Sequence, residues 1–138
     1  MLQSNSDKFT FLTQKGYLSC LPDSHSTILD CTFHHDDKLA RINNNKRFLG
    51  SVMRIINDHY NGNNLIRQVK IRNYPDKNTM MFIKKNIKKY GIILKDIHKD
   101  RTNNVLNVTI KYTNSDKFYQ FRRKSNEIIN DMIEKIDD

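Results

Sequence analysis

The chain has 138 residues, the size of one domain, with a net charge of +9 and a mean hydropathy of −0.74. No apolar run approaches the roughly 18 residues of a membrane-spanning helix, so we expect no membrane partner. Two prolines and four glycines are too few for a flexible linker.

The positive charge is concentrated in the middle of the chain. Residues 41–125 carry a net charge of +15, whereas residues 1–40 carry −2 and residues 126–138 carry −4. A domain this basic repels itself unless phosphates or counterions neutralise it. We therefore expect a nucleic acid as the main partner, and a solvated lysine-rich surface is the alternative.

The first 45 residues are expected to form an irregular N-terminal extension that docks on another surface. Short apolar runs at residues 9–12, 17–21 and 27–33 could form strands. Cys20 and Cys31 are too few for a disulfide scaffold, which favours a reducing or matrix-like compartment. Abundant asparagine, isoleucine and lysine indicate an AT-rich genome, such as that of an organelle, a protist or a virus.

A helix followed by a strand is predicted next in the chain. Leu49, Val52, Met53, Ile56 and Tyr60 form one apolar stripe at helical spacing, which predicts a helix over residues 46–60. A cluster of asparagines and a glycine at 61–64 predicts a turn, and residues 65–71 follow as a strand.

A lysine-rich amphipathic helix is predicted from about residue 76 to residue 90. Asp76 suits its N-terminus, and Gly91 suits the position after its end. Met80, Ile83 and Ile87 share one face, and the lysines at 84, 85, 88 and 89 cover the other. The helix therefore presents a row of positive charge away from its apolar side.

A β-hairpin and a terminal helix complete the chain. Strands are expected at residues 92–99 and 105–112, joined by a polar turn at 100–104. Alternation places Leu106, Val108, Ile110 and Tyr112 on one face of the second strand. A helix is expected over residues 116–136. The order helix, strand, helix, strand, strand, helix predicts an α+β fold with two layers.

Three regions follow: an extension at 1–45, a two-layer α-β-α-β-β domain at 46–114, and a C-terminal helix with its tail at 115–138. Lysine and arginine side chains on helices contact phosphates and position a protein on RNA without reading sequence. The residues expected to bind RNA are Arg47, Arg54, Lys77, Lys84, Lys85, Lys88, Lys89, Lys111, Arg122, Arg123 and Lys124.

One cluster of possible metal ligands competes with this interpretation. Cys20, His25, Cys31, His34 and His35 could be drawn as a zinc site, but their spacing lacks the paired ligands that zinc sites commonly have. No nucleophile motif and no glycine-rich phosphate loop is present. We therefore expect no metal, no cofactor, no small-molecule substrate and no enzymatic activity. A small metal-dependent enzyme built on the cluster is the least favoured alternative.

Residues 52–112 resemble the N-terminal domain of the bacterial and organellar small-subunit ribosomal protein eight family. The motifs that carry the resemblance are, in chain order, Arg54-Ile55-Ile56-Asn57, Val69-Lys70-Ile71, Pro75, Gly91-Ile92-Ile93 and Ile110-Lys111-Tyr112. The stretch Arg122-Arg123-Lys124-Ser125 is similar to the basic segment before the C-terminal domain of that family. Three features differ: the loop after Asn57 is longer, Asp76-Lys77-Asn78 replaces the usual serine-lysine, and the serine-threonine-x-x-glycine signature is missing.

The resemblance implies a structural protein of the small ribosomal subunit that binds ribosomal RNA and contacts neighbouring ribosomal proteins. Because the family's C-terminal domain makes major RNA contacts, its missing signature implies that this unit works as one piece of a larger assembly. An organellar ribosome in the mitochondrial matrix fits both the resemblance and the composition. The alternative is a stand-alone nucleic-acid-binding or regulatory protein, for example of a virus.

Overall fold

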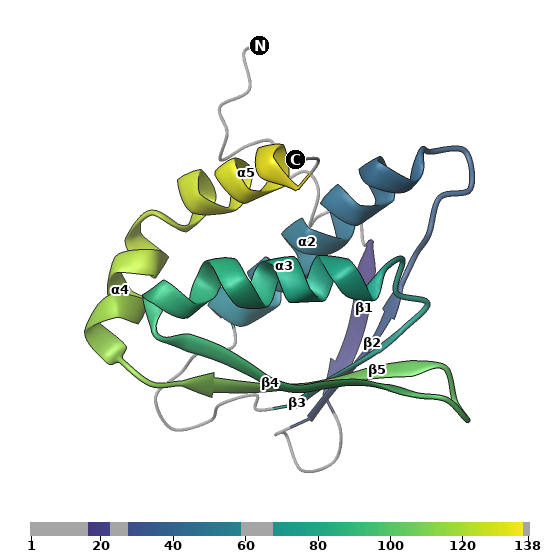
Figure 1. Cartoon of the computed structure of the whole chain (residues 1–138), viewed down its shortest axis with the longest axis horizontal. Helices are drawn as coiled ribbons and strands as arrows, with labels where there is room; N and C mark the ends of the chain where they lie inside the picture. Colours follow the sequence, from purple (N-terminus) through teal and green to yellow (C-terminus); the bar gives the residue numbers. More distant parts are fainter. Residues whose placement is uncertain (1–16, 23–27, 59–67, 137–138) are drawn as a thin grey trace.

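The computed structural model describes residues 17–22, 28–58 and 68–136, and it has an α+β fold (Figure 1). The predicted fold class is confirmed. The strands are β1 (Leu18–Pro22), β2 (Ile28–Phe33), β3 (Gln68–Arg72), β4 (Ile92–Asp100) and β5 (Val105–Tyr112). The helices are α2 (Arg41–Asp58), α3 (Lys77–Ile87), the 3₁₀ turn η1 (Lys88–Tyr90), α4 (Ser115–Arg123) and α5 (Ser125–Lys135).

The strands form one mixed sheet in the order β1-β2-β3-β5-β4. Only β2 and β3 run parallel, and α2 lies between them in the chain, as a parallel connection requires. The other neighbours pair antiparallel. The helix–strand–helix–strand–strand order predicted from residue 46 onward is therefore present, with β5 in the middle of its three strands.

Helices cover one face of this sheet (Figure 1). Leu106, Val108 and Ile110 of β5 are buried in the core with Met80, Ile83 and Ile87 of α3. The predicted alternation in β5 and the predicted stripe of α3 are both confirmed. Since successive side chains in a strand point to opposite faces, the other face of the sheet carries the polar residues of β3, β4 and β5.

Helix α2 is buried over most of its circumference, and it begins earlier than predicted, at Arg41. Phe48, Leu49, Met53 and Ile56 are fully buried, and Tyr112 donates a hydrogen bond from its hydroxyl to the carbonyl of Ile56 at 2.9 Å. Polar residues such as Asn44 and Asn45 are buried as well. Neighbours on several sides, α3, α5 and β1 among them, account for this burial.

The N-terminal part of the chain differs from the irregular extension that we predicted. Residues 18–22 and 28–33 form a hairpin that extends the main sheet, with β2 paired to β3. The apolar alternation of β2 explains this, since Leu29, Cys31 and Phe33 are buried in the common core. The strand considered at residues 9–12 and the turn at 61–64 lie outside the described residues.

The single C-terminal helix predicted for residues 116–136 is two helices. Asn114 caps α4 by accepting a hydrogen bond from the amide of Lys117, and the helix ends at Arg123. Phe118 and Phe121 of α4 fill one end of the core, whereas Ile129 and Met132 of α5 pack beside α2. A straight helix could not follow both surfaces, so the chain turns at Lys124 and α5 lies outside the layer formed by α2 and α3 (Figure 1).

Candidate nucleic-acid interface

Helix α3 presents its lysines to solvent because its other side is locked into the core. Asp76 caps the helix by accepting a hydrogen bond from the amide of Asn78 at 2.9 Å. Thr79, Met80, Ile83 and Ile87 are buried. The lysines at 77, 84, 85, 88 and 89 are exposed, as the amphipathic pattern predicted. This rigid row of ammonium groups is suited to contacting successive phosphates.

Helix α4 brings a second basic group to the end of this row. The rings of Tyr90 and Phe121 lie 5.6 Å apart between centroids, which joins η1 to the end of α4. Lys89 lies with its Nζ 5.3 Å from the centre of the Tyr90 ring. The exposed Arg122, Arg123 and Lys124 follow directly.

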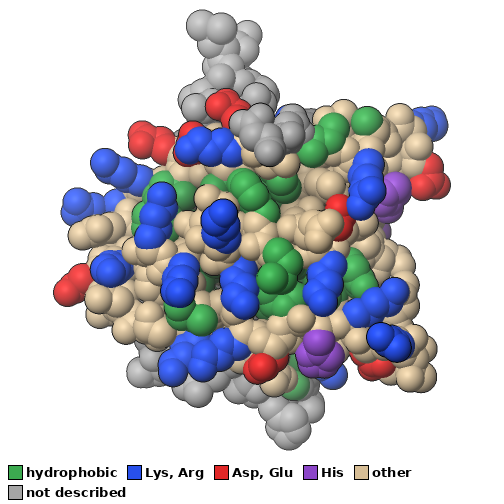
Figure 2. Space-filling view, viewed as in Figure 1, with side chains coloured by type: hydrophobic (Ala, Val, Ile, Leu, Met, Phe, Trp, Pro, Cys, Tyr) green, Lys and Arg blue, Asp and Glu red, His purple; other side chains and the backbone are tan. Residues whose placement is uncertain are grey.

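These residues make up what we call the basic surface: Lys77, Lys84, Lys85, Lys88, Lys89, Arg122, Arg123 and Lys124. Figure 2 shows lysine and arginine side chains spread over the face of the molecule on which α3 and α4 lie, with few acidic groups among them. A surface of one sign attracts a polyanion and raises its rate of association.

Two predicted arginines are held by the protein itself. Arg47 is largely buried, with its guanidinium 4.1 Å from the centre of the Tyr17 ring and 3.7 Å from Asp36. Arg54 pairs with Asp58 one helical turn later, at 2.8 Å. Both belong to α2, whose burial the sequence pattern underestimated. The structure does not bring them into the basic surface.

Lys111 also lies apart from the basic surface. It stands opposite Ile93 in the β4–β5 pairing, between Ile110 and Tyr112, which face the helices. It therefore points to the opposite, open face of the sheet. Lys70, Arg72 and Lys95 belong to this open face too, and Arg72 forms an ion pair with Asp30.

The cysteine–histidine cluster does not form a metal site in the described residues. Cys20 and Cys31 lie opposite each other on β1 and β2 and form a disulfide, a pairing that the low cysteine count did not predict. A disulfide leaves no thiolate to bind zinc. His34 contacts Ser19, with 2.5 Å between Nε2 and Oγ, and His35 lies 3.1 Å from Asp37. His25 lies outside the described residues.

One carboxyl group outside the basic surface has a shifted pKa. The side-chain amide of Asn103 and the backbone amide of Thr102 donate hydrogen bonds to Asp100, and together they hold its pKa below the ordinary value. The group lies where β4 leads into the turn to β5, and the same hydrogen bonds hold the residues of that turn together.

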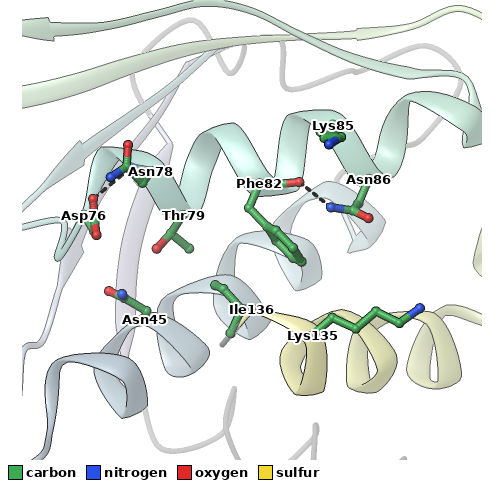
Figure 3. A pocket seen from close by; sticks show the side chains of 9 residues that line it. All are labelled: Asn45, Asp76, Asn78, Thr79, Phe82, Lys85, Asn86, Lys135 and Ile136. Atoms are coloured by element: carbon green, nitrogen blue, oxygen red, sulfur yellow. Dashed lines mark hydrogen bonds between the residues drawn. The ribbon is translucent and has the colours of Figure 1, made fainter. Parts of the chain in front are cut away.

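A pocket between α2, α3 and α5 contains residues that sequence reasoning missed. Asn45, Asn78, Asn86 and Lys135 line it together with Lys85 (Figure 3). They come from three helices distant in sequence, and asparagine is so abundant in this chain that no single one stands out. Only the packing of α5 over α2 and α3 brings them together.

No protein-family model, no curated protein and no solved structure matches this chain. Among the described residues, no helix has the length and apolarity needed to cross a membrane.

Proposed function

We propose that this protein is a structural constituent of the small ribosomal subunit of an organelle, the mitochondrion, and binds ribosomal RNA without catalysing a reaction. The observation that carries the proposal is the basic surface on α3 and α4, set on a helix–strand–helix–strand–strand unit. The resemblance of residues 52–112 to the ribosomal protein eight family is the reason that we propose ribosomal RNA as the polyanion that binds this surface. Neighbouring ribosomal proteins are the further partners that we propose.

The chemistry of the basic surface supports RNA backbone contacts. Its eight side chains are all exposed, and the core fixes the helices beneath them. Ammonium and guanidinium groups neutralise phosphates and release counterions, a contribution that does not depend on base sequence. Such a surface suits a structured RNA, which proteins recognise largely by shape and backbone.

The disulfide bears on the proposed compartment. Disulfides persist in oxidising compartments and are rare where thiols are kept reduced. The bond between Cys20 and Cys31 therefore requires that the compartment of the proposed organellar ribosome leave these two thiols oxidised. Alkylation of free thiols before lysis of isolated organelles tests this point: if the two cysteines are alkylated without prior reduction, they are reduced in the cell.

A charge-reversal pair tests RNA binding by the basic surface. We expect Lys84→Glu with Lys88→Glu to weaken binding to small-subunit RNA and to reduce the slope of log K against log salt by about 2. The matched control, Lys95→Glu with Lys111→Glu, makes the same charge change on the open sheet face. Filter binding over a salt series measures both. If both double variants lose the same RNA affinity, the basic surface is not the site that binds RNA.

Sedimentation of organelle extracts tests the ribosomal assignment. The protein should travel with small subunits and should leave that fraction when magnesium is removed and the subunits unfold. The alternative, a stand-alone nucleic-acid-binding protein, is supported by the basic surface alone and predicts a free protein at the top of the gradient. Finding the protein only there would end the ribosomal proposal while leaving RNA binding intact.

A further inference from the structure

One large aromatic side chain lies exposed beside the basic surface. Tyr119 of α4 is 54% exposed, and Leu21 and Met81 are the other exposed large apolar side chains in the described part of the chain. A single exposed apolar residue is common on protein surfaces. What distinguishes Tyr119 is its position among positive charges.

Helix periodicity places Tyr119 on the same side of α4 as two arginines. Residues three and four apart in a helix are neighbours on its surface, so Arg122 and Arg123 lie one turn after Tyr119. Both arginines are exposed and belong to the basic surface. Asp116, one turn before Tyr119, is the acidic residue of this helix. The positive charge on this side of the helix therefore follows the ring.

The core holds in place the helix that carries the ring. Phe118 and Phe121 flank Tyr119 in the sequence and are fully buried, with 5.8 Å between their ring centroids. Phe121 also lies 5.6 Å from the ring of Tyr90, which brings the end of the α3 lysine row next to α4. A ligand that contacts these cations therefore meets the tyrosine at a fixed place, which lowers the entropic cost of binding.

We propose that Tyr119 stacks on one unpaired base of the RNA while Arg122 and Arg123 contact the phosphates beside that base. An aromatic ring offers a flat face to a nucleobase, and such stacking tolerates any base because every base has a π-face. Unpaired bases in loops and bulges have open faces, whereas bases inside a duplex are already stacked. The inference rests on the proposed RNA binding and adds the place where a single-stranded segment is held.

A tryptophan at position 119 of the full chain tests the inference. The protein contains no tryptophan, so an introduced one reports on its own surroundings alone. Tyr119→Trp keeps an aromatic face, and we expect single-stranded penta-adenosine to quench its fluorescence as binding saturates. A short RNA duplex should bind and leave the fluorescence nearly unchanged. The control is Leu21→Trp, at an exposed position of β1 outside the basic surface, and it should respond to neither RNA.

Two further substitutions separate the aromatic face from apolar area. Tyr119→Leu keeps an apolar side chain without a π-face and should weaken penta-adenosine binding by about tenfold. Tyr119→Phe keeps the face and should bind penta-adenosine within about twofold of the wild type. Both variants should bind the duplex like the wild type. Because Tyr119 is more than half exposed, neither substitution should disturb the core.

Four results would overturn the inference. If penta-adenosine binds without quenching Tyr119→Trp, the ring contacts no base and the proposed function stands. If the duplex quenches the tryptophan as strongly as penta-adenosine does, the ring does not select unpaired bases. If vesicles of anionic phospholipid shift the emission to shorter wavelength and RNA has no effect, this surface binds lipid instead. If neither RNA binds the wild-type protein, the proposed function fails and the inference fails with it.

Discussion

At the scale of single residues, Gly91 connects the lysine-rich helix to the hairpin. Its backbone has φ of +75°, in the left-handed region, and its amide donates to the carbonyl of Lys88 at 3.1 Å. Its own carbonyl accepts from the amide of Thr113 at 2.7 Å and from the Thr113 hydroxyl at 3.1 Å. One residue thus ends η1 and ties it to the end of β5.

We expect Gly91→Ala to destabilise the protein by about 2 kcal/mol or more. A Cβ at this position would lie 2.9 Å from the backbone oxygen of Asn114, in addition to the unfavourable φ. Urea denaturation measures the change in the free energy of unfolding, and the m-value of the variant should equal that of the wild type. The control is Asn104→Gly, at φ of +52°, which should alter stability by no more than about 0.5 kcal/mol. If both variants lose the same stability, the conflict between a Cβ at residue 91 and the backbone of Asn114 is not the cause.

At the scale of elements, the start of α3 controls how the lysines are presented. Asp76 caps the helix and also accepts a hydrogen bond from Arg41 at 2.6 Å, which links the starts of α2 and α3. Arg41 is exposed, so solvent weakens this ion pair. The cap is therefore the larger contribution to stability.

Asp76→Ala should reduce the free energy of unfolding by about 1–2 kcal/mol through loss of the cap. Asp76→Asn keeps a capping oxygen and removes only the charge, so it should cost less than about 1 kcal/mol. Chemical denaturation followed by circular dichroism compares the two. If asparagine proves as damaging as alanine, the ion pair with Arg41 outweighs the cap.

At the scale of the whole molecule, the sheet joins chain segments that are distant in sequence. Among the described strands, β1 lies at the edge of the sheet and pairs only with β2, and the disulfide crosses this pair with 4.1 Å between the Cα atoms. The β2 strand itself is held by its buried side chains and by β3. The disulfide therefore secures the edge strand to the rest of the fold.

Reduction of the disulfide should destabilise the protein by about 3 kcal/mol, because the bond closes a short loop in the unfolded chain. The two cysteines are 11 positions apart. Denaturation with and without dithiothreitol measures the effect. The Cys20→Ala, Cys31→Ala double variant, which has no bond to reduce, should show no response to the reductant. A wild-type protein that is equally stable in both conditions would contradict this prediction.

The sequence by itself determined the elements whose pattern is local. The stripe of α3, the alternation of β5 and the exposure of Lys84, Lys85 and Lys88 follow from helical and strand periodicity, and the structure has them. The end of the lysine-rich helical segment at Gly91 could also be predicted from the sequence, because a helix end depends on residues that are neighbours in the chain. These features need no knowledge of distant contacts.

Only the tertiary structure decided which charges lie together. It placed Arg47 beside Asp36 and Tyr17, turned Lys111 to the open face of the sheet, and broke the last helix at Lys124. It also assembled the pocket from three helices and brought Cys20 opposite Cys31. The physical reason is common to all of these: each depends on packing between segments far apart in the chain, which periodicity within one element does not encode.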